Sequence, residues 1–270
     1  GSAFDFANAH VIILPELMGP NPHQSPITIT NDITVCPEAE ANFHSGGYLP
    51  SESEENYLRA IWKLAGDDDS NWIPTGLVAE RVGVSPPSAT SMVQQLCDRG
   101  WLDHKRYGGV RLTSEGRMLA VQTVRRHRIL ETYLSKILGV PWDRVDSEVE
   151  RLEHSVSEDL ICRMEEALGF PDRDPHGSPI PDRQGVLPTR QDLFLDLAPL
   201  ATSLEIVRVE DALPEVLHWL GERGIRPGVV VTVESREPAG GPVLLKLPGR
   251  ESAFAISGKL ARSISVTRVG

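Results

Sequence analysis

The chain has 270 residues, 40% of them hydrophobic and 24% charged, with a net charge of −11 at pH 7. This length suits two domains or three small ones, and the apolar content is ample for a core. No apolar run approaches the roughly 20 residues of a membrane-spanning helix, and the short run at 11–14 follows no basic segment typical of a signal peptide. Three widely spaced cysteines indicate a reducing, cytoplasmic compartment and argue against a disulfide framework or a thiolate zinc site.

Residues 1–50 have little helical or strand periodicity and are rich in Pro, Asn and Ser. We expect them to form a disordered tail or to be a remnant of cloning, since the chain opens with GSAF. A helix should follow, capped by Ser51 or Ser53 and ending at Gly66.

The segment 74–100 has the pattern of a helix–turn–helix. Thr75 is a predicted N-cap, Gly83 a turn residue, and Ser85 the cap of a second helix with proline in its first turn. Two strands, Leu102–Arg106 and Val110–Thr113, then predict a β-hairpin. Together these elements form a winged helix, which we place at 51–122.

The basic residues gather in this region although the chain is acidic overall. Residues 74–128 hold nine Lys or Arg and four Asp or Glu, a local charge of +5. Such a patch can bind DNA phosphates, because these contacts act within a Debye length of about 8 Å. A solvated charged surface and a winged helix used for protein contacts are the alternatives.

Three further helices are expected at 114–139, 142–152 and after a cap at Ser155 or Ser157. Their apolar residues form a face of the kind that dimerises; these are Val149, Leu152, Val156, Leu160 and Ile161. We therefore predict a helical metal-binding and dimerisation domain at 123–182 and a linker at 183–201. Short strands, glycine turns and one helix at 214–224 predict a small β-barrel at 202–270.

Potential metal ligands lie on two of these helices. His127 and Glu131 are four residues apart, and the other segment carries Asp146, Glu150, Glu153 and His154. Spacings of three and four place side chains on one helical face. Since no ligand is a sulfur atom, Mn²⁺ or Fe²⁺ fits best. A solvent-exposed acidic helix is the alternative, and the absence of HExxH, phosphate-loop or nucleophile-elbow patterns argues against an enzyme.

The chain resembles the diphtheria-toxin-repressor family of metal-dependent regulators, and within it the manganese transport regulators. The matching segments over 52–182 are EENYLRAIWKL, VAERVGVSPPSATSMVQQLCDRGWL, KRYGGVRLTSEG, VRRHRILETYL, EVERLEH and DPHGSPIP. Over 203–270 the match is looser and centres on GIRPG. The resemblance implies a mainly α fold with small β: an N-terminal winged helix-turn-helix, a helical dimerisation domain and a C-terminal SH3-like, FeoA-type barrel.

The resemblance also implies paired metal sites between the DNA-binding and dimerisation domains. The primary site corresponds to Glu150, Glu153, His154 and Asn56. The second site corresponds to His127 and Glu131, with Asp146 or Asp174, and Asp211 aligns with a position that reaches it in some relatives. Glu150 stands where iron-type regulators have Cys, which favours Mn²⁺ over Fe²⁺. Other departures are Asn56 in place of Asp or Met, Asp146 and Asp174 in place of His and Cys, and Arg208 in place of an acid near Asp211.

By this resemblance a metal-loaded homodimer binds double-stranded operator DNA and represses metal-uptake genes, with half-sites about 34–36 Å apart or a multiple. The residues expected at the DNA are Thr75, Ser85, Pro87, Ser88 and Ser91 on the helices and Lys105, Arg106 and Tyr107 on the wing. The alternatives are an iron-dependent regulator of the same family and a metal-independent winged-helix interaction module.

Overall fold

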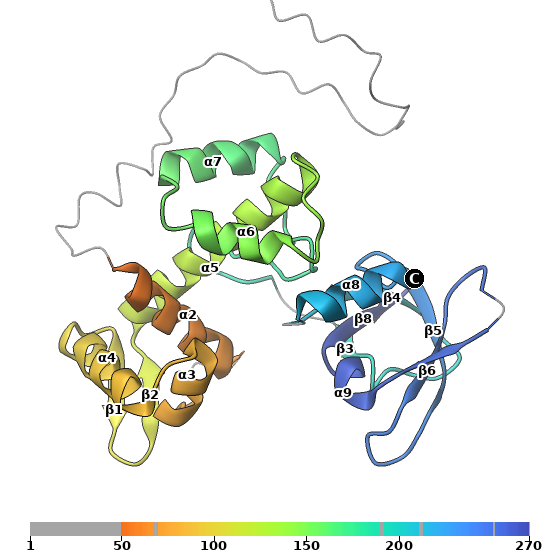
Figure 1. Ribbon diagram of the computed structural model, residues 1–270, viewed down its shortest axis with the longest axis horizontal. Coiled ribbons are helices and arrows are strands. Elements are labelled where there is room, and N and C mark those ends of the chain that lie inside the picture. The colour runs from red at the N-terminus through yellow and green to blue at the C-terminus, as the bar shows by residue number, and fades with distance from the viewer. Residues whose placement is uncertain are drawn as a thin grey trace, which may run out of the picture. The chain divides into compact units, whose positions relative to one another are not determined.

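The computed structural model describes residues 50–66, 68, 70–188, 192–210, 213–250 and 252–269. The predictions for residues 1–49 and for Asp211 lie outside these ranges. Within them, helices dominate up to residue 167 and strands dominate thereafter. This confirms the predicted fold class, mainly α with a small β part (Figure 1).

The first described elements form a winged helix. They are α2 (Glu52–Ala65), α3 (Thr75–Val82), α4 (Pro86–Asp98), β1 (Leu102–Lys105) and β2 (Gly109–Leu112). Gly83 takes a left-handed φ of 76° between α3 and α4, a conformation that glycine adopts without strain. Ser85 accepts a hydrogen bond from the backbone of Ser88 and caps α4 as predicted. Buried Leu58, Ile61 and Leu96 belong to the shared core.

The prediction of Thr75 as a helix cap is wrong. Pro74 holds the N-cap position of α3 and Thr75 is already helical. The early start of α3 follows from pairing with the wing. Ile73 forms two backbone hydrogen bonds of 2.8 Å with Val110 of β2. The chain leaves this bridge at Ile73 and turns into the helix one residue earlier than the cap pattern predicts.

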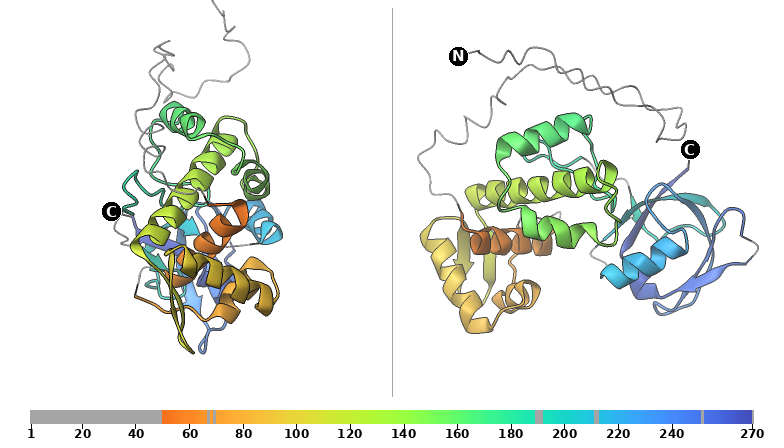
Figure 2. Two further views of the ribbon diagram at one scale, coloured as in Figure 1. Left: turned by 90° about the vertical axis from the view of Figure 1, so that its left-hand side faces the viewer. Right: turned by 45° about the horizontal axis from the view of Figure 1, so that its top comes forward.

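A helical unit follows, made of α5 (Ser114–Lys136), α6 (Val145–Leu152) and α7 (Glu158–Ala167). The long helix α5 contacts α2, α6 and α7 (Figure 2). Helix α6 begins at Val145 and not near Trp142, because residues 142–144 form a turn that places the Trp142 ring in a buried position.

The predicted dimerisation face divides into two parts. Val149 and Ile161 are buried in the core of this chain, together with Ile129 of α5. Leu152 and Leu160 are 41% and 43% exposed. Of the predicted dimerisation face, Val149 and Ile161 therefore pack inside this chain, because α5 covers them, whereas Leu152 and Leu160 lie at the surface.

The C-terminal part is a six-stranded antiparallel sheet in the order β3-β8-β4-β5-β6-β7. Its elements are β3 (Leu193–Phe194), β4 (Ser203–Val209), α8 (Pro214–Glu222), β5 (Val230–Arg236), β6 (Val243–Lys246), β7 (Phe254–Ile256), α9 (Gly258–Ala261) and β8 (Ile264–Arg268). The short β3, β7 and α9 were not predicted. None of the helices in the described ranges is long and apolar enough to cross a membrane.

Candidate metal centre

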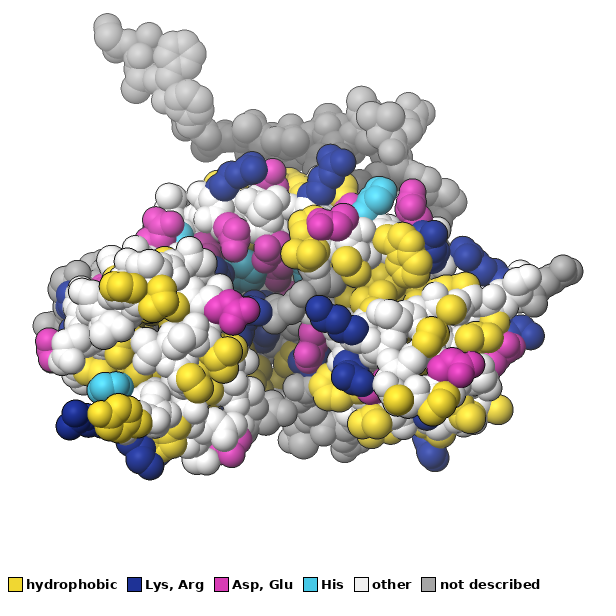
Figure 3. Space-filling view, turned by 60° about the horizontal axis from the view of Figure 1, so that its bottom comes forward, with side chains coloured by type: hydrophobic (Ala, Val, Ile, Leu, Met, Phe, Trp, Pro, Cys, Tyr) yellow, Lys and Arg dark blue, Asp and Glu magenta, His cyan; other side chains and the backbone are white. Residues whose placement is uncertain are grey.

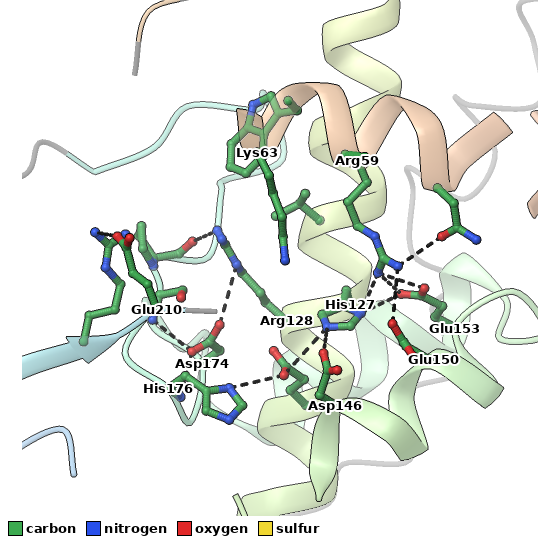
Figure 4. Close-up of a pocket in the computed structure, with 18 of the residues that line it drawn as sticks. Arg59, Lys63, His127, Arg128, Asp146, Glu150, Glu153, Asp174, His176 and Glu210 are labelled. Atoms are coloured by element: carbon green, nitrogen blue, oxygen red, sulfur yellow. Dashed lines mark hydrogen bonds and ion pairs between the residues drawn. The ribbon is translucent and has the colours of Figure 1, made fainter. Parts of the chain in front are cut away.

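Acidic and histidine side chains from α2, α5, α6 and the segment 172–182 line one recess (Figure 4). Figure 3 shows such side chains gathered in a hollow of the surface. We distinguish two groups in it. The Glu131 cluster consists of His127, Glu131, Asp146, Asp174 and His176. The Glu153 cluster consists of Asn56, Glu150, Glu153 and His154.

Glu131 is the shared member of two potential ligand sets. Its carboxylate, His127 and Asp146 offer ligand atoms within 4.8 Å of one another, and so do Glu131, Asp174 and His176. His127 Nε2 lies 3.1 Å from Asp146 and 3.7 Å from Glu131. On the other side of Glu131, His176 Nδ1 lies at 3.3 Å. The structure thus places Asp146 and Asp174, together with His127, around Glu131, and it adds a histidine to these predicted second-site residues.

His176 was not predicted as a site residue. Its Nε2 lies 2.7 Å from the carbonyl oxygen of Trp142, which can only accept, so Nε2 carries a proton and Nδ1 faces Glu131. Such an outer hydrogen bond fixes the orientation of metal-binding histidines. Asp174 turns the chain here by accepting the backbone N–H groups of His176 and Ser178. The sequence DPHG could have indicated His176 as a site residue, because Asp174 and His176 lie in the same tight turn.

Burial and charge together make the Glu131 cluster attract cations. Burial alone would lower the pKa of His127, but Glu131, Asp146 and Glu153 hold it well above its ordinary value. Burial would likewise lower the pKa of His176, and Glu131 raises it to about 9. Burial and the charge of Glu131 raise the pKa of Asp174 to about 6. In the metal-free state the carboxylates therefore keep His127 and His176 protonated. Binding of a divalent ion would release these protons.

The Glu153 cluster is arranged differently. Glu153 is 1% exposed, which rules out the solvent-exposed acidic helix for this residue. His154 Nδ1 lies 2.8 Å from Glu55 Oε2, and its Nε2 lies 3.5 Å from Glu153. This carboxylate–histidine pair leaves Nε2 directed toward Glu153, the orientation typical of a metal ligand. The Glu150 side chain is 58% exposed.

Arg59 on α2 occupies the space between these ligands. Its Nη1 lies 2.9 Å and 3.2 Å from the two carboxylate oxygens of Glu153, and its Nη2 donates to Asn56 Oδ1 at 3.0 Å. Among the described residues, the ligand atoms of Glu150, Glu153 and His154 do not come within 4.8 Å of one another as a set. His127 Nδ1 contacts Glu153 at 2.7 Å and so joins the two clusters.

All these candidate ligands offer nitrogen or oxygen, and the described thiols, Cys97 and Cys162, belong to neither cluster. Donor sets of this kind fit hard or borderline divalent ions. In chemistry, charge and burial the two clusters therefore fit the divalent metal implied by the sequence.

All but one of the predicted DNA-facing side chains are exposed. These are the cap residue Ser85 and, on α4, Pro87, Ser88 and Ser91, while Ala89, Val93 and Leu96 on the other face of α4 are buried. On the wing, Lys105, Arg106 and Tyr107 are exposed, with Tyr107 at 94%. Thr75 at the start of α3 is partly buried.

Two adjacent glutamates of α2 connect the Glu153 cluster with α4, which is the helix predicted to contact DNA and is called the reader helix below. Glu54 is fully buried, and its carboxylate accepts from Gln95 of α4 and pairs with Arg99 at the end of α4, each at 2.8 Å. Glu55 pairs with His154 and, at 3.0 Å, with Arg126. Both glutamates belong to α2, so the same helix contacts the Glu153 cluster and supports α4.

Comparison with known proteins places this arrangement in a family. The model of the iron-dependent repressor N-terminal DNA-binding domain matches residues 51–110, and that of the metal-binding and dimerisation domain matches 113–182. A FeoA domain matches 194–268, which confirms the predicted FeoA-type part. The iron-dependent repressor IdeR of Mycobacterium bovis is 30% identical over 230 residues, 81% of this chain and 98% of the relative. IdeR of Mycobacterium leprae is 29% identical over 238 residues, with the same coverage.

Solved structures agree. A manganese-dependent transcriptional repressor in complex with manganese superposes with a TM-score of 0.73 at 35% identity, covering 80% of this chain and 100% of that chain. ScaR with bound Zn²⁺ superposes with a TM-score of 0.68 at 27% identity, covering 82% and 100%. These relatives are regulators and not enzymes, as the sequence patterns predicted. The chain therefore belongs to the diphtheria-toxin-repressor family of metal-dependent, DNA-binding transcriptional repressors.

Proposed function

We propose that the protein is a manganese-responsive regulator that binds operator DNA as a metal-loaded homodimer and represses metal-uptake genes. The observation that carries this proposal is the pair of joined clusters, in which every candidate ligand is an oxygen or nitrogen donor. Glu150 supplies an oxygen donor rather than a thiolate, which favours Mn²⁺. Fe²⁺ is the alternative, because the relatives include both iron-dependent and manganese-dependent repressors.

The proposed response follows from charge. In the metal-free state, protonated His127, protonated His176 and Arg59 balance the negative charge of the carboxylates. A bound divalent ion would supply this positive charge instead. Glu55 orients His154 toward Glu153, and Glu54 holds α2 to α4. Ligands drawn together at α5 and α6 would therefore set the position of α2 and, through Glu54, that of the reader helix.

The homodimer is part of the proposal. A family model for a dimerisation domain covers 113–182, and exposed apolar side chains are found there. Among them are Ile137, Leu138, Leu152, Leu160 and Phe170. We propose that these side chains form the dimer interface. The proposal also includes a cytoplasmic location, because operator DNA is found there.

The test is DNA binding with one metal at a time. Operator sequences would be selected from random DNA in separate experiments with Mn²⁺, Fe²⁺ and Zn²⁺, and binding then titrated by fluorescence anisotropy. We expect Mn²⁺ to activate binding at the lowest free concentration, a chelator to reverse it, and analytical ultracentrifugation to show a dimer.

The control is Glu148→Gln, on α6 but outside both clusters, which should respond as the parent does. Activation at lower free Fe²⁺ than Mn²⁺ would assign the protein to the iron-dependent type. DNA binding that is indifferent to chelator would leave only the metal-independent module.

A further inference from the structure

Arg59 provides an internal cation for the Glu153 cluster. Its side chain is 15% exposed, against 1% for Glu153, so the pair is shielded from water. Nη1 reaches both oxygens of Glu153 and lies 3.0 Å from His127 Nδ1. Nη2 lies 3.0 Å from Asn56 Oδ1 and 3.9 Å from Glu150 (Figure 4).

These contacts engage the same atoms that a metal would need. Three of the four residues in the cluster lie within 4 Å of the guanidinium, and the fourth, His154, lies 3.5 Å from the same carboxylate of Glu153. A guanidinium is planar, permanently charged and suited to carboxylates, so it neutralises a buried glutamate well. A divalent ion placed among the same oxygens would repel it at short range.

We propose that Arg59 is the built-in competitor of the metal at the Glu153 cluster. The guanidinium stabilises the metal-free arrangement, and it must leave Glu153 when the cluster loads. Arg59 therefore sets the free metal concentration at which the regulator responds. This inference rests on the proposed function, because it requires metal to bind at Glu153.

The test measures metal binding directly, by titration calorimetry of the full chain with Mn²⁺. Glu150→Ala identifies which Mn²⁺ binding step belongs to the Glu153 cluster, because this substitution should abolish that step. Glu150 is exposed, so its replacement should leave the fold intact. Charged hydrogen bonds of this kind are worth enough that Arg59→Gln should tighten this step by about tenfold. Arg59→Met should act in the same direction, while Arg59→Lys, which keeps the charge, should stay near the parent.

Arg151→Gln is the matched control. Arg151 lies on α6 beside Glu150, its side chain is 70% exposed, and it pairs with Glu148 outside the cluster. This change removes the same charge from the chain but frees no ligand. It should therefore leave the affinity unchanged.

Thermal unfolding provides a second readout. In chelator, Arg59→Gln should melt below the parent, because Glu153 loses its cation. In saturating Mn²⁺ the difference should disappear or reverse. Weaker or unchanged binding in both Arg59→Gln and Arg59→Met, with a parent that binds normally, would overturn the inference alone. Binding by neither the parent nor the variants would overturn the proposed function as well.

Discussion

The shared carboxylate of Glu131 offers the sharpest test of the metal centre. Glu131→Gln keeps the size of the side chain and one hydrogen-bonding oxygen but removes the charge. That charge lies 3.3 Å from His176 and 3.7 Å from His127, in a position that is 3% exposed. One substitution therefore acts on both ligand sets at once.

The metal-free chain should become less stable. The rise of the His176 pKa from 6.5 to about 9 corresponds to about 3 kcal/mol in favour of its protonated form. Removing Glu131 loses this attraction but relieves the repulsion that raises the pKa of Asp174. Since breaking a buried pair costs about 3–5 kcal/mol before such relief, we expect a net loss of about 2 kcal/mol.

Metal should rescue the parent much more than the variant. An ion that binds the folded state at 100 times its Kd adds about 2.7 kcal/mol of stability. With Glu131 absent from both ligand sets, the part of the gain that comes from the Glu131 cluster should fall below about 1 kcal/mol at the same free Mn²⁺. The assay is urea unfolding followed by tryptophan fluorescence, in chelator and in Mn²⁺.

Glu148→Gln, on an exposed position of α6, is the control and should gain as much from metal as the parent. If Glu131→Gln kept the full gain from Mn²⁺, Glu131 would not be a ligand and the reasoning from the Glu131 cluster would fail.

Four further outcomes are expected. Glu54→Gln should weaken operator binding at saturating Mn²⁺ by about tenfold, because it loosens Arg99 of the reader helix; an unchanged anisotropy titration would refute this link. Arg106→Ala should weaken binding to all DNA sequences and reduce the slope of log K against log salt by about one, so an unaltered slope would remove the wing from the interface. Glu150→Cys should shift activation from Mn²⁺ toward softer ions, and identical activation profiles for Mn²⁺, Fe²⁺ and Zn²⁺ would contradict the ligand assignment. The pKa of His176, raised to about 9, makes the metal-free chain keep this stabilisation below about pH 6.5 and lose it as pH rises through 9. The stability difference between the parent and Glu131→Gln in chelator should therefore shrink from pH 7 to pH 9.5, and a constant difference would argue against this protonation.

Local elements could be predicted because their causes are local. Ser85 caps α4 and Gly83 closes the turn before it, and both act through backbone groups within a few residues. The four-residue spacing of His127 and Glu131 likewise places them on one face of a helix, whatever surrounds it. The family match extended these local patterns to the expected ligand positions and to the FeoA-type part.

The tertiary structure decided which side chains meet. Arg59 and Glu55 lie about a hundred residues before Glu153 and His154, and no spacing rule relates them. His176 reaches Glu131 only because the tight turn at Asp174–His176, in the segment 172–182, packs against α5. The burial of Val149 and Glu153 also depends on packing against other helices. The sequence therefore could not show which apolar residues of the predicted dimerisation face are buried within the chain. Nor could it show that Glu153 is buried although it lies in an acidic segment. Helix and turn patterns specify the direction of a side chain, whereas its partner, charge balance and exposure depend on distant segments that only the folded chain brings together.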